Sequence, residues 1–596
     1  MHRLLYNASS SLKSTSQSRM PLPFHLRLFL FFLFLLPMST SSATSLTSFL
    51  LRLQSAALET LGPTGFDPKL YVDLPLSRPL PLAVSAFDRL PRVNGSVPGP
   101  VLKSFLSDYT LEAGSDLVVA EPPDFSPDPE GFLPNVRHPE VRKWALEVHS
   151  LWRNLTRRVA EDVTEDPDLH TLLPLPEPVV VPGSRFREVY YWDSYWSIRG
   201  LLVSKMYDTA KSIVRNLISL IDVYGFVPNG ARSYYSNRSQ PPLLSAMVSE
   251  IYNRTGDLKF VAESLPSLLK EHSFWNSGIH EVSIKDLQGR IHSLSRYYAM
   301  WDKPRPESAT IDEESASKLL TMYEKESFYR EVASTAETGW DFSSRWMRNS
   351  SDMTTLATTS IIPVDLNAYI YKMELDIAFF ANLTGDNSTS AKFLKASKAR
   401  QAAIESIFWN EEMGQWLDYW LTDNNNCEEH KFDVRKQNHN IYASNFIPVW
   451  IQKNTSGGAV EKVMKSFENS GLLHPAGIAT SLSNTGQQWD FPNGWAPLQH
   501  MIVEGFVRSG SKEACSLAED IAVRWLRTNY AAYKKTGTMQ EKYDVEACGE
   551  VGGGGEYNIQ TGFGWSNGVV LAFLEEFGWS ADKEINCQMI KEIRKL

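Results

Sequence analysis

EIYNRTGDLKFVAESLPSLLKEHSFWN, residues 250–276, is echoed later in the chain by AFFANLTGD (378–386) and AAIESIFWN (402–410). Both copies contain an N-x-T-G-D turn and close on F-W-N. In each copy the residues on either side of the turn favour helix, so the recurring unit is a pair of helices joined by a Gly-containing turn. A third unit, weaker in sequence, runs from Leu498 through an RSGS turn to Tyr530.

The helix before the first of these units is apolar over a wide arc. Two sets of residues repeat there at helical spacing: Ile213, Leu217 and Leu220, and Val214, Ile218 and Ile221. Such a helix is expected to pack on two sides. Helical hairpins cannot bury their apolar faces alone, and either stacking into a solenoid or closing into a ring solves that problem. The spacing leaves both arrangements open.

The N-terminal part of the chain has a different composition. Residues 45–139 are rich in Pro and lack a helical period, which predicts an extended arm laid over a main domain at 140–596. Residues 1–44 contain the apolar run LFLFFLFLL (28–36), which follows basic residues and precedes small ones. That order is typical of a secretory signal, cleaved or retained as a membrane anchor. It predicts an extracellular protein, either secreted or attached to the outer face of the plasma membrane.

Composition narrows the class of protein and its partners. The 596 residues carry a net charge of -10 and include 17 Trp and 23 Tyr, which is typical of a globular protein. No basic run is interleaved with aromatics, so nucleic acid is not an expected partner. The four cysteines lack a C-x-x-C pair, so we expect no metal site and no disulfide scaffold, although one bridge stays open. No cofactor is expected.

N-x-[ST] sequons support a secretory compartment. They occur at Asn94, Asn154, Asn237, Asn253, Asn349, Asn382, Asn387 and Asn454. Asn237 lies inside a candidate substrate loop, where a glycan would obstruct the cleft. We therefore expect Asn237 to be bare.

Two runs rich in aromatics carry the clearest chemical signal. They are PGSRFREVYYWDSYW (182–196) and QQWDFPNGWAPLQ (487–499), and each places Asp directly after Trp. An aromatic face covers the C–H side of a pyranose, while carboxylate, Arg and amide groups bind its hydroxyls. The runs therefore predict a sugar-binding cleft.

Five further segments without helical period lie between the predicted helices. They are VPNGARSYYSNRSQPP (227–242), WDKPRPES (301–308), ETGWDFSSRW (337–346), QEKYDVE (540–546) and GGGGEYNIQTGFGWSNG (552–568). If they converge at one end of a helical barrel, they bring together several carboxylates and three Arg that can bind a polyol. Two of the acids could hydrolyse a glycoside, one protonated to release the leaving oxygen and one ionised to activate water.

Simpler interpretations exist for each of these features. A single Trp-Asp pair is usually a packed aromatic beside a helix-capping carboxylate. Arg305 and Glu307 could form an ordinary surface ion pair. Residues 552–555 lack a following G-K-[ST], so a lid over the cleft is favoured there over a phosphate cradle.

Taken together, the segments resemble the trehalases, an inverting glycoside hydrolase family with an (α/α)6 barrel. The resemblance runs through PGSRFREVYYWDSYW, NGARSYYSNRSQPP, RPES, ETGWDFSSRW, QWDFPNGWAP, EKYD and GGGGEYNIQTGFGWSNG in the family's order, over about residues 65 to 580. It implies an all-α toroid of helical hairpins with an extended N-terminal arm. It also implies hydrolysis of α,α-trehalose to two glucose molecules with inversion at the attacked anomeric carbon.

The resemblance also implies roles for single residues. Asp341 matches the family's general acid and Glu541 its general base. Substrate contacts carry over to Arg185, Trp192, Asp193, Asn229, Arg238, Ser239, Gln240, Arg305, Pro306, Glu307, Gly339 and Glu556. One departure is Ser184, which stands where the family usually has Gly, and a left-handed turn there would be mildly strained by Ser.

Two other functions remain as alternatives. The first is another helical-barrel glycosidase that acts on a different α-glucoside. The second is a cell-surface sugar-binding protein without turnover, whose expected signature is a missing acid or base. Both Asp341 and Glu541 are present.

Overall fold

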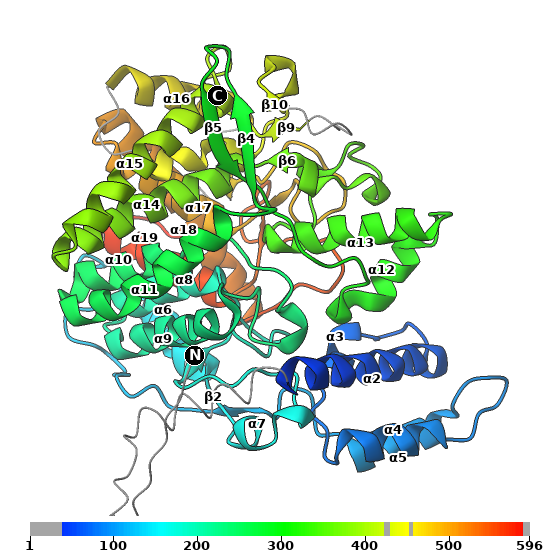
Figure 1. Cartoon of the computed structure of the whole chain (residues 1–596). Helices are drawn as coiled ribbons and strands as arrows, with labels where there is room; N and C mark the ends of the chain where they lie inside the picture. The colour runs from blue at the N-terminus through cyan, green and yellow to red at the C-terminus, as the bar shows by residue number, and fades with distance from the viewer. Residues whose placement is uncertain (1–37, 422–429, 452–456, 588–596) are drawn as a thin grey trace, which may run out of the picture.

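A closed ring of six helices forms the centre of the protein. The computed structural model describes residues 38–421, 430–451 and 457–587 (Figure 1). The inner helices are α8 (Asp193–Val203), α10 (Leu244–Thr255), α14 (Val364–Leu383), the 3₁₀ helix η9 (Ala443–Trp450), α17 (Ala496–Arg508) and α19 (Gly564–Phe577). Each contacts the next in this order, and α19 contacts α8. The ring therefore closes, which excludes the solenoid and confirms the (α/α)6 barrel.

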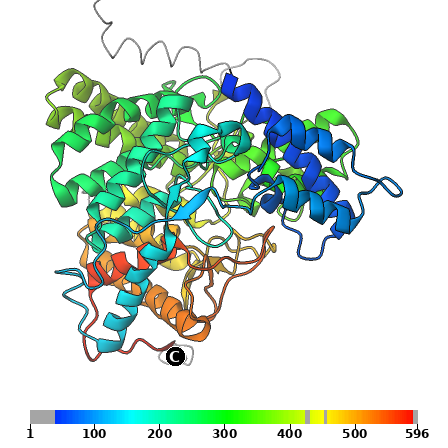
Figure 2. The same ribbon diagram turned by 90° about the horizontal axis from the view of Figure 1, so that it is seen from below.

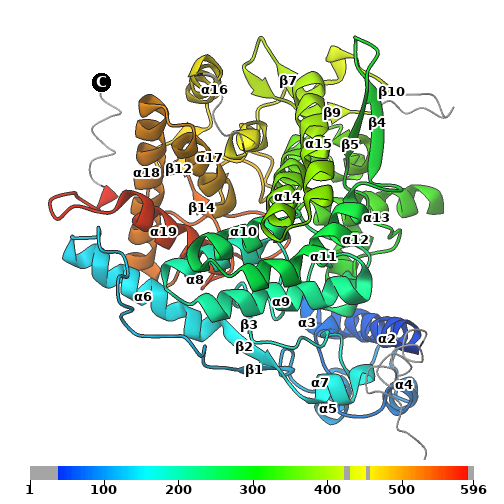
Figure 3. The same ribbon diagram turned by 60° about the vertical axis from the view of Figure 1, so that its left-hand side comes forward.

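A second layer of helices surrounds this ring. It consists of α6 (Pro139–Leu155), α9 (Tyr207–Tyr224), α11 (Leu258–Trp275), α15 (Asn387–Ala403), α16 (Gly457–Asn469) and α18 (Lys512–Thr536). In Figure 3, α14 and α15 lie side by side, as do α17 and α18. The hairpins expected from the sequence are α10–α11, α14–α15 and α17–α18, each an inner helix followed by an outer one.

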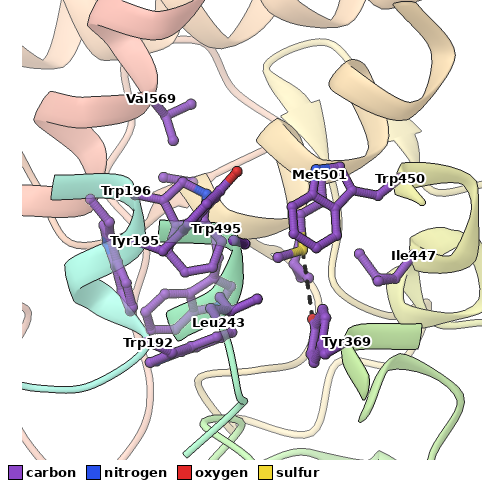
Figure 4. Packing of buried hydrophobic residues seen from close by; sticks show 14 of the residues in the cluster. Trp192, Tyr195, Trp196, Leu243, Tyr369, Ile447, Trp450, Trp495, Met501 and Val569 are labelled. Carbon is purple, nitrogen blue, oxygen red and sulfur yellow. Dashed lines mark hydrogen bonds between the residues drawn. The ribbon is translucent and has the colours of Figure 1, made fainter. Parts of the chain in front are cut away.

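The inner helices meet around a core of large side chains (Figure 4). Tyr195 of α8, Tyr369 of α14 and Trp450 of η9 are buried there, and the Tyr369 hydroxyl contacts the Met501 sulfur at 3.6 Å. α8 and α19 approach so closely that a Cβ at Gly568 would lie 1.9 Å from the carbonyl oxygen of Trp196. A glycine is therefore required at that crossing.

The elements that lie between the barrel helices are short, except for α13. The helices are α7 (Asp162–Glu165), α12 (Ala309–Ala316), α13 (Met322–Glu337), the π turn η7 (Ile404–Phe408) and the 3₁₀ turns η1 (Pro167–Leu169), η2 (Ser233–Tyr235), η3 (Pro306–Ser308), η4 (Ser344–Trp346), η5 (Met353–Thr355), η6 (Thr358–Ser360) and η8 (Val434–Lys436). The strands form small sheets in the orders β1-β2-β3, β10-β4-β5, β11-β12, β13-β14, β6-β9 and β7-β8.

Most of these strands pair antiparallel, and β10 runs parallel to β4. Their bounds are β1 Leu117–Val119, β2 Thr156–Val159, β3 Val179–Val180, β4 Glu281–Lys285, β5 Ile291–Ser295, β6 Ile361–Ile362, β7 Trp409–Asn410, β8 Gln415–Trp416, β9 Tyr419–Trp420, β10 His430–Lys431, β11 Leu473–His474, β12 Gly477–Ile478, β13 Asn493–Gly494 and β14 Tyr543–Asp544. The β13–β14 pair joins two of the segments singled out in the sequence.

Residues 38–110 are largely helical, which corrects the expectation of an extended arm for this part of 45–139, whereas residues 111–138 contain no helix. The helical part contains α2 (Met38–Leu61), α3 (Pro68–Val72), α4 (Leu80–Asp88) and α5 (Gly99–Tyr109), and we call residues 38–110 the N-terminal cap. Figures 1 and 2 show these helices, in blue, grouped on one side of the barrel. Their prolines occupy first turns, where the missing N–H costs nothing, so a Pro-rich composition did not exclude helix.

The N-terminal cap has its own apolar core and is joined to the barrel by buried charges. Phe49, Leu53 and Phe87 pack in this core together with barrel tyrosines that include Tyr190 and Tyr235. Beneath it, the Lys69 ammonium lies 2.9 Å from Asp73 and 2.8 Å from Glu188, and Arg232 lies 2.9 Å from Glu188. Breaking one partner of a buried network of this kind is strongly destabilising, so cap and barrel are expected to fold together.

The start of the described chain bears on the predicted secretory signal. The predicted signal at 1–44 lies mostly outside the described residues, and α2 begins within it at Met38. Within the described ranges, no helix combines the length and apolar composition needed to cross a membrane.

Near the C-terminal end Cys548 and Cys587 form a disulfide, the bridge that the sequence left open. Cys515 is a free thiol and Cys427 lies outside the described residues.

Candidate active site

One pocket collects nearly all of the residues singled out in the sequence. The segments that precede α8, α10, α17 and α19 supply much of its wall, so it lies at the N-terminal ends of these inner helices. Its lining includes Arg185, Trp192, Asp193, Asn229, Arg238, Gln240, Arg305, Glu307, Gly339, Asp341, Glu541 and Glu556. The pocket holds about 680 Å3 of empty space, counting the part open to solvent.

Ser239 and Pro306 are the two expected substrate contacts that do not line the pocket. The Ser239 N–H donates to Glu337 at 2.8 Å, and its hydroxyl donates to the Val227 carbonyl at 2.7 Å. Pro306 is buried, and its carbonyl accepts a hydrogen bond from Gln54 at 3.0 Å. Both residues therefore hold their segments in place from behind the pocket wall.

Asp341 follows a sharp turn at the end of α13. Gly339 has φ +74° there, and a Cβ at this position would lie 2.8 Å from the Trp192 ring. Burial raises the pKa of Asp341 to about 7, although the Arg305 guanidinium 3.9 Å away opposes the rise. The carboxyl is therefore close to half protonated at neutral pH, as a general acid requires.

Glu541 lines the same pocket in a different environment. Tyr557 donates its hydroxyl to Oε1 at 2.8 Å, and the Gln560 N–H donates to Oε2 at 3.4 Å. Burial raises the pKa of Glu541, while the charge of Lys542 and these hydrogen bonds oppose the rise. Because the donors favour the ionised form, this carboxylate is suited to accept a proton.

Asp193 is a third buried carboxyl in the same pocket. Burial raises its pKa to about 8, and the charges of Glu541 and Asp341 push it in the same direction. Because the charges of Glu541 and Asp341 act on Asp193, the three carboxyls do not all ionise at once. At neutral pH Asp193 is mostly protonated and can donate a hydrogen bond to a sugar oxygen.

The three arginines are each held by acidic side chains. Arg185 donates to both oxygens of Asp67 at 2.9 and 2.8 Å. Arg305 pairs in the same way with Asp312 and also reaches Glu556 at 2.8 Å. Arg238 donates to Glu307. Arg305 and Glu307 therefore bind other partners, and the surface ion pair considered from the sequence does not form.

The second Trp-Asp run supports the loop that carries Asp341. Gln488 donates to the Asp341 carbonyl at 2.5 Å, and the Trp489 N–H donates to the Phe342 carbonyl at 3.0 Å. Asp490 is buried and accepts hydrogen bonds from Ser343 and Ser344. For Asp490 the structural interpretation of a Trp-Asp pair is therefore correct, whereas Asp193 faces the pocket.

Aromatic rings form one wall of the pocket. Trp489 stacks on Trp495 with ring centroids 3.9 Å apart and an interplanar angle of 2°. Trp192 packs against Trp489 at 5.7 Å and against Trp565 at 5.9 Å. Figure 4 shows Trp192 and Trp495 close together within the buried cluster. This wall provides the apolar surface that the C–H face of a pyranose requires.

The structure also reveals features that the motifs did not single out. Tyr557 directly follows Glu556 in a quoted run, so its position was an available signal. Asp67 lies in the N-terminal segment, where no pattern pointed to the pocket. Ser184 does not have a left-handed φ, so the strain expected there does not arise. Its hydroxyl donates to the Thr561 carbonyl at 3.1 Å. Among the described residues no group of His, Cys, Asp or Glu is arranged to hold a metal ion.

The barrel, the aromatic wall and the pair of carboxyls in different environments define a helical-barrel glycoside hydrolase. The Trehalase family profile matches residues 64–578. The chain belongs to the trehalase family.

Similar proteins cover most of the chain. It is 64% identical over 554 residues to a probable trehalase of Oryza sativa subsp. japonica, covering 91% of this chain and 98% of that protein. It is 38% identical to the trehalase of Homo sapiens, covering 86% of each. Neutral trehalase Nth1 from Saccharomyces cerevisiae superposes with a TM-score of 0.58 at 23% identity, over 76% of this chain and 96% of that one, and so shares the fold.

Proposed function

We propose that this protein hydrolyses α,α-trehalose to two molecules of glucose, with inversion at the attacked anomeric carbon. One observation carries the proposal. In a chain of the trehalase family, a single pocket holds Asp341, whose pKa is raised to about 7, together with Glu541, which accepts a hydrogen bond from Tyr557.

Asp341 and Glu541 divide the chemistry between them. Protonated Asp341 gives its proton to the glycosidic oxygen as the C–O bond breaks. Ionised Glu541 takes a proton from a water molecule, whose oxygen attacks the anomeric carbon from the opposite face. Attack inverts that carbon, so one glucose leaves as the β anomer and the other as the α anomer.

The other residues of the pocket bind and orient the sugar. Arg185, Arg238 and Arg305 supply charged donors, and Asn229, Gln240, Glu307 and Glu556 supply further polar groups. Charge-assisted hydrogen bonds from residues already held by ion pairs orient hydroxyl groups at small entropic cost. Trp192 and Gly339 shape the wall beside the acid.

A panel of sugars tests the substrate. Purified protein is incubated with trehalose, maltose and isomaltose, and the initial products are resolved by anomer with NMR. We expect trehalose to be cleaved to equal amounts of α- and β-glucose. Cleavage of maltose without trehalose would indicate the other α-glucosidase, and two α anomers from trehalose would contradict inversion.

Amide variants test the two catalytic roles and the alternative of a sugar-binding protein. Asp341→Asn and Glu541→Gln should each lower kcat by at least about 100-fold while trehalose binding, measured by calorimetry, persists. Wild-type protein that binds trehalose without turnover would establish the sugar-binding alternative. Full activity in Asp341→Asn would refute the role of the general acid.

We also propose that the protein acts outside the cell, as a glycoprotein of the secretory pathway, either secreted or membrane-attached through its N-terminal apolar run. The Cys548–Cys587 disulfide supports an oxidising compartment. Six sequons among the described residues are exposed, at Asn94, Asn154, Asn253, Asn349, Asn382 and Asn387, and Asn454 lies outside the described residues. Asn237 is half-buried and its amide donates to the Tyr234 carbonyl at 3.2 Å, which favours a bare side chain.

The mature protein tests this localisation. N-terminal sequencing distinguishes a cleaved signal from a retained anchor, and deglycosylation should increase electrophoretic mobility in wild type and Asn237→Gln alike. Protein that keeps Met1, gains no mobility on deglycosylation and is recovered from the cytosol would contradict the proposal.

A further inference from the structure

Arg185, a pocket residue, is held by a residue from outside the barrel. Its Nε and Nη2 donate to the two oxygens of Asp67 at 2.9 and 2.8 Å. Two parallel charge-assisted hydrogen bonds fix the plane of a guanidinium as well as its position. Nη1 has no carboxylate partner among the described residues and remains for a sugar hydroxyl.

Asp67 is itself held firmly within the N-terminal cap. It is the N-cap of α3, where Oδ1 accepts the Lys69 N–H at 3.1 Å. The Lys69 ammonium is fully buried and pairs with Asp73 and Glu188, the latter a barrel residue. The position of Asp67 is thus fixed relative to the barrel by a buried ion pair on the same helix.

From Arg185 the contacts lead to Glu541. The guanidinium carbon lies 4.8 Å from the centroid of the Tyr557 ring, which is cation–π distance. The Tyr557 hydroxyl donates to Glu541 at 2.8 Å. Asp67 is therefore connected to the proposed base by Arg185 and Tyr557 in turn.

A second contact of the N-terminal cap reaches another substrate segment. The buried Gln54 amide of α2 donates to the Pro306 carbonyl at 3.0 Å and to the Pro68 carbonyl at 2.9 Å. It thereby links the start of α3 to the residues between Arg305 and Glu307. Cap and pocket wall meet at two independent points.

We propose that the N-terminal cap completes the active site, with Asp67 as a positioning residue that holds Arg185 in the plane needed to bind substrate and to support Tyr557 against Glu541. This inference rests on the proposed function. The cap is then part of the catalytic unit, although it contributes no group to the reaction itself.

Asp67→Asn is the most informative change. Asn caps helices as well as Asp does, so α3 is retained, whereas the second charged acceptor for Arg185 is lost. Small misplacements of substrate-binding groups cost large factors in rate, so we expect kcat/KM for trehalose to fall by about 10-fold or more. The matched control is Asp88→Asn, which removes an Arg–Asp pair on the exposed side of the same cap, with Arg52. It should leave kcat/KM unchanged.

A double-mutant cycle separates positioning from folding. If Asp67 acts through Arg185, adding Asp67→Asn to Arg185→Ala should lower kcat/KM no further, and the thermal midpoint should match that of Arg185→Ala alone. Additive losses in the double variant, or wild-type kcat/KM in Asp67→Asn, would overturn the inference.

Wild-type protein is assayed in parallel to separate this inference from the proposed function. If it cleaves another α-glucoside instead of trehalose, the proposed function fails, and the same cycle run on that sugar still decides the role of Asp67.

Discussion

At the residue scale, the two proposed catalytic carboxyls differ because their neighbours differ. Burial raises the pKa of Asp341, and the charges of two arginines, Arg305 at 3.9 Å and Arg238, oppose the rise. Burial also raises the pKa of Glu541, but an adjacent Lys and two hydrogen-bond donors favour its charged form. These environments favour Asp341 as the proposed acid and Glu541 as the proposed base.

This difference predicts a bell-shaped dependence of kcat/KM on pH. The pKa of Asp341 is about 7, so the rate should fall as pH rises through that value and the acid loses its proton. On the acidic side the rate should fall as Glu541 gains a proton. Measuring kcat/KM for trehalose from about pH 4 to pH 9 checks both limbs. A rate that keeps rising above about pH 8 contradicts the assignment of Asp341.

Gly339→Ala is expected to impair catalysis through the position of Asp341. The new methyl group would lie 2.8 Å from the Trp192 ring on a backbone with φ +74°, so the turn or the ring must move. We expect kcat/KM to fall by about 100-fold. Gly256→Ala is the control, because Gly256 has φ +65° and nothing within 4 Å of the added Cβ. Equal kinetic losses in both variants would show that backbone strain, and not displacement at the site, causes the effect.

At the element scale, local pattern predicted the barrel hairpins and failed for the N-terminal cap. The N-x-T-G-D turns correspond to the ends of α10 and α14, where Gly256 ends the first helix in left-handed conformation. The cap was missed because prolines at the first turn of a helix, such as Pro68 in α3, look like helix breakers in a composition count. Asp67 could not be assigned to the pocket because its partner Arg185 is 118 residues away.

The second Trp-Asp run offers a test of its supporting role. Asp490 accepts the Ser344 N–H at 2.8 Å and both serine hydroxyls of the loop that follows Asp341. Asp490→Asn replaces one acceptor with a donor, so we expect kcat to fall by about 10-fold with a smaller change in KM. The control Asp352→Asn alters a more exposed loop carboxylate that accepts from Thr354 away from the pocket. An unchanged kcat in Asp490→Asn would contradict the supporting role.

At the scale of the whole molecule, the site is assembled from segments that are remote in sequence. The sequence runs predicted which residues share the pocket, since all but Ser239 and Pro306 line it. They could not predict which of those residues hold one another, because Asp312, Tyr557 and Gln488 act through contacts that only the closed ring creates. The roles proposed for these residues come from the family resemblance, and the packing offers physical reasons for them.

The Cys548–Cys587 disulfide should stabilise the side of the barrel that carries the proposed base. It links residues 39 apart, and the segment between them includes Glu556, Tyr557 and α19, the helix that closes the ring against α8. Cross-linking a span of this length restricts the unfolded chain, so Cys548→Ser with Cys587→Ser should lower the free energy of unfolding by roughly 3 to 4 kcal/mol. Scanning calorimetry of the double variant, with Cys515→Ser as the control for loss of a free thiol, measures this effect. Glu541 lies outside the linked span, but Tyr557, which donates to it, lies within the span. In the double variant we therefore expect kcat to fall on heating before the protein unfolds. An unchanged thermal midpoint in the double variant would mean that the contacts of α19 with α8 alone hold this side of the barrel.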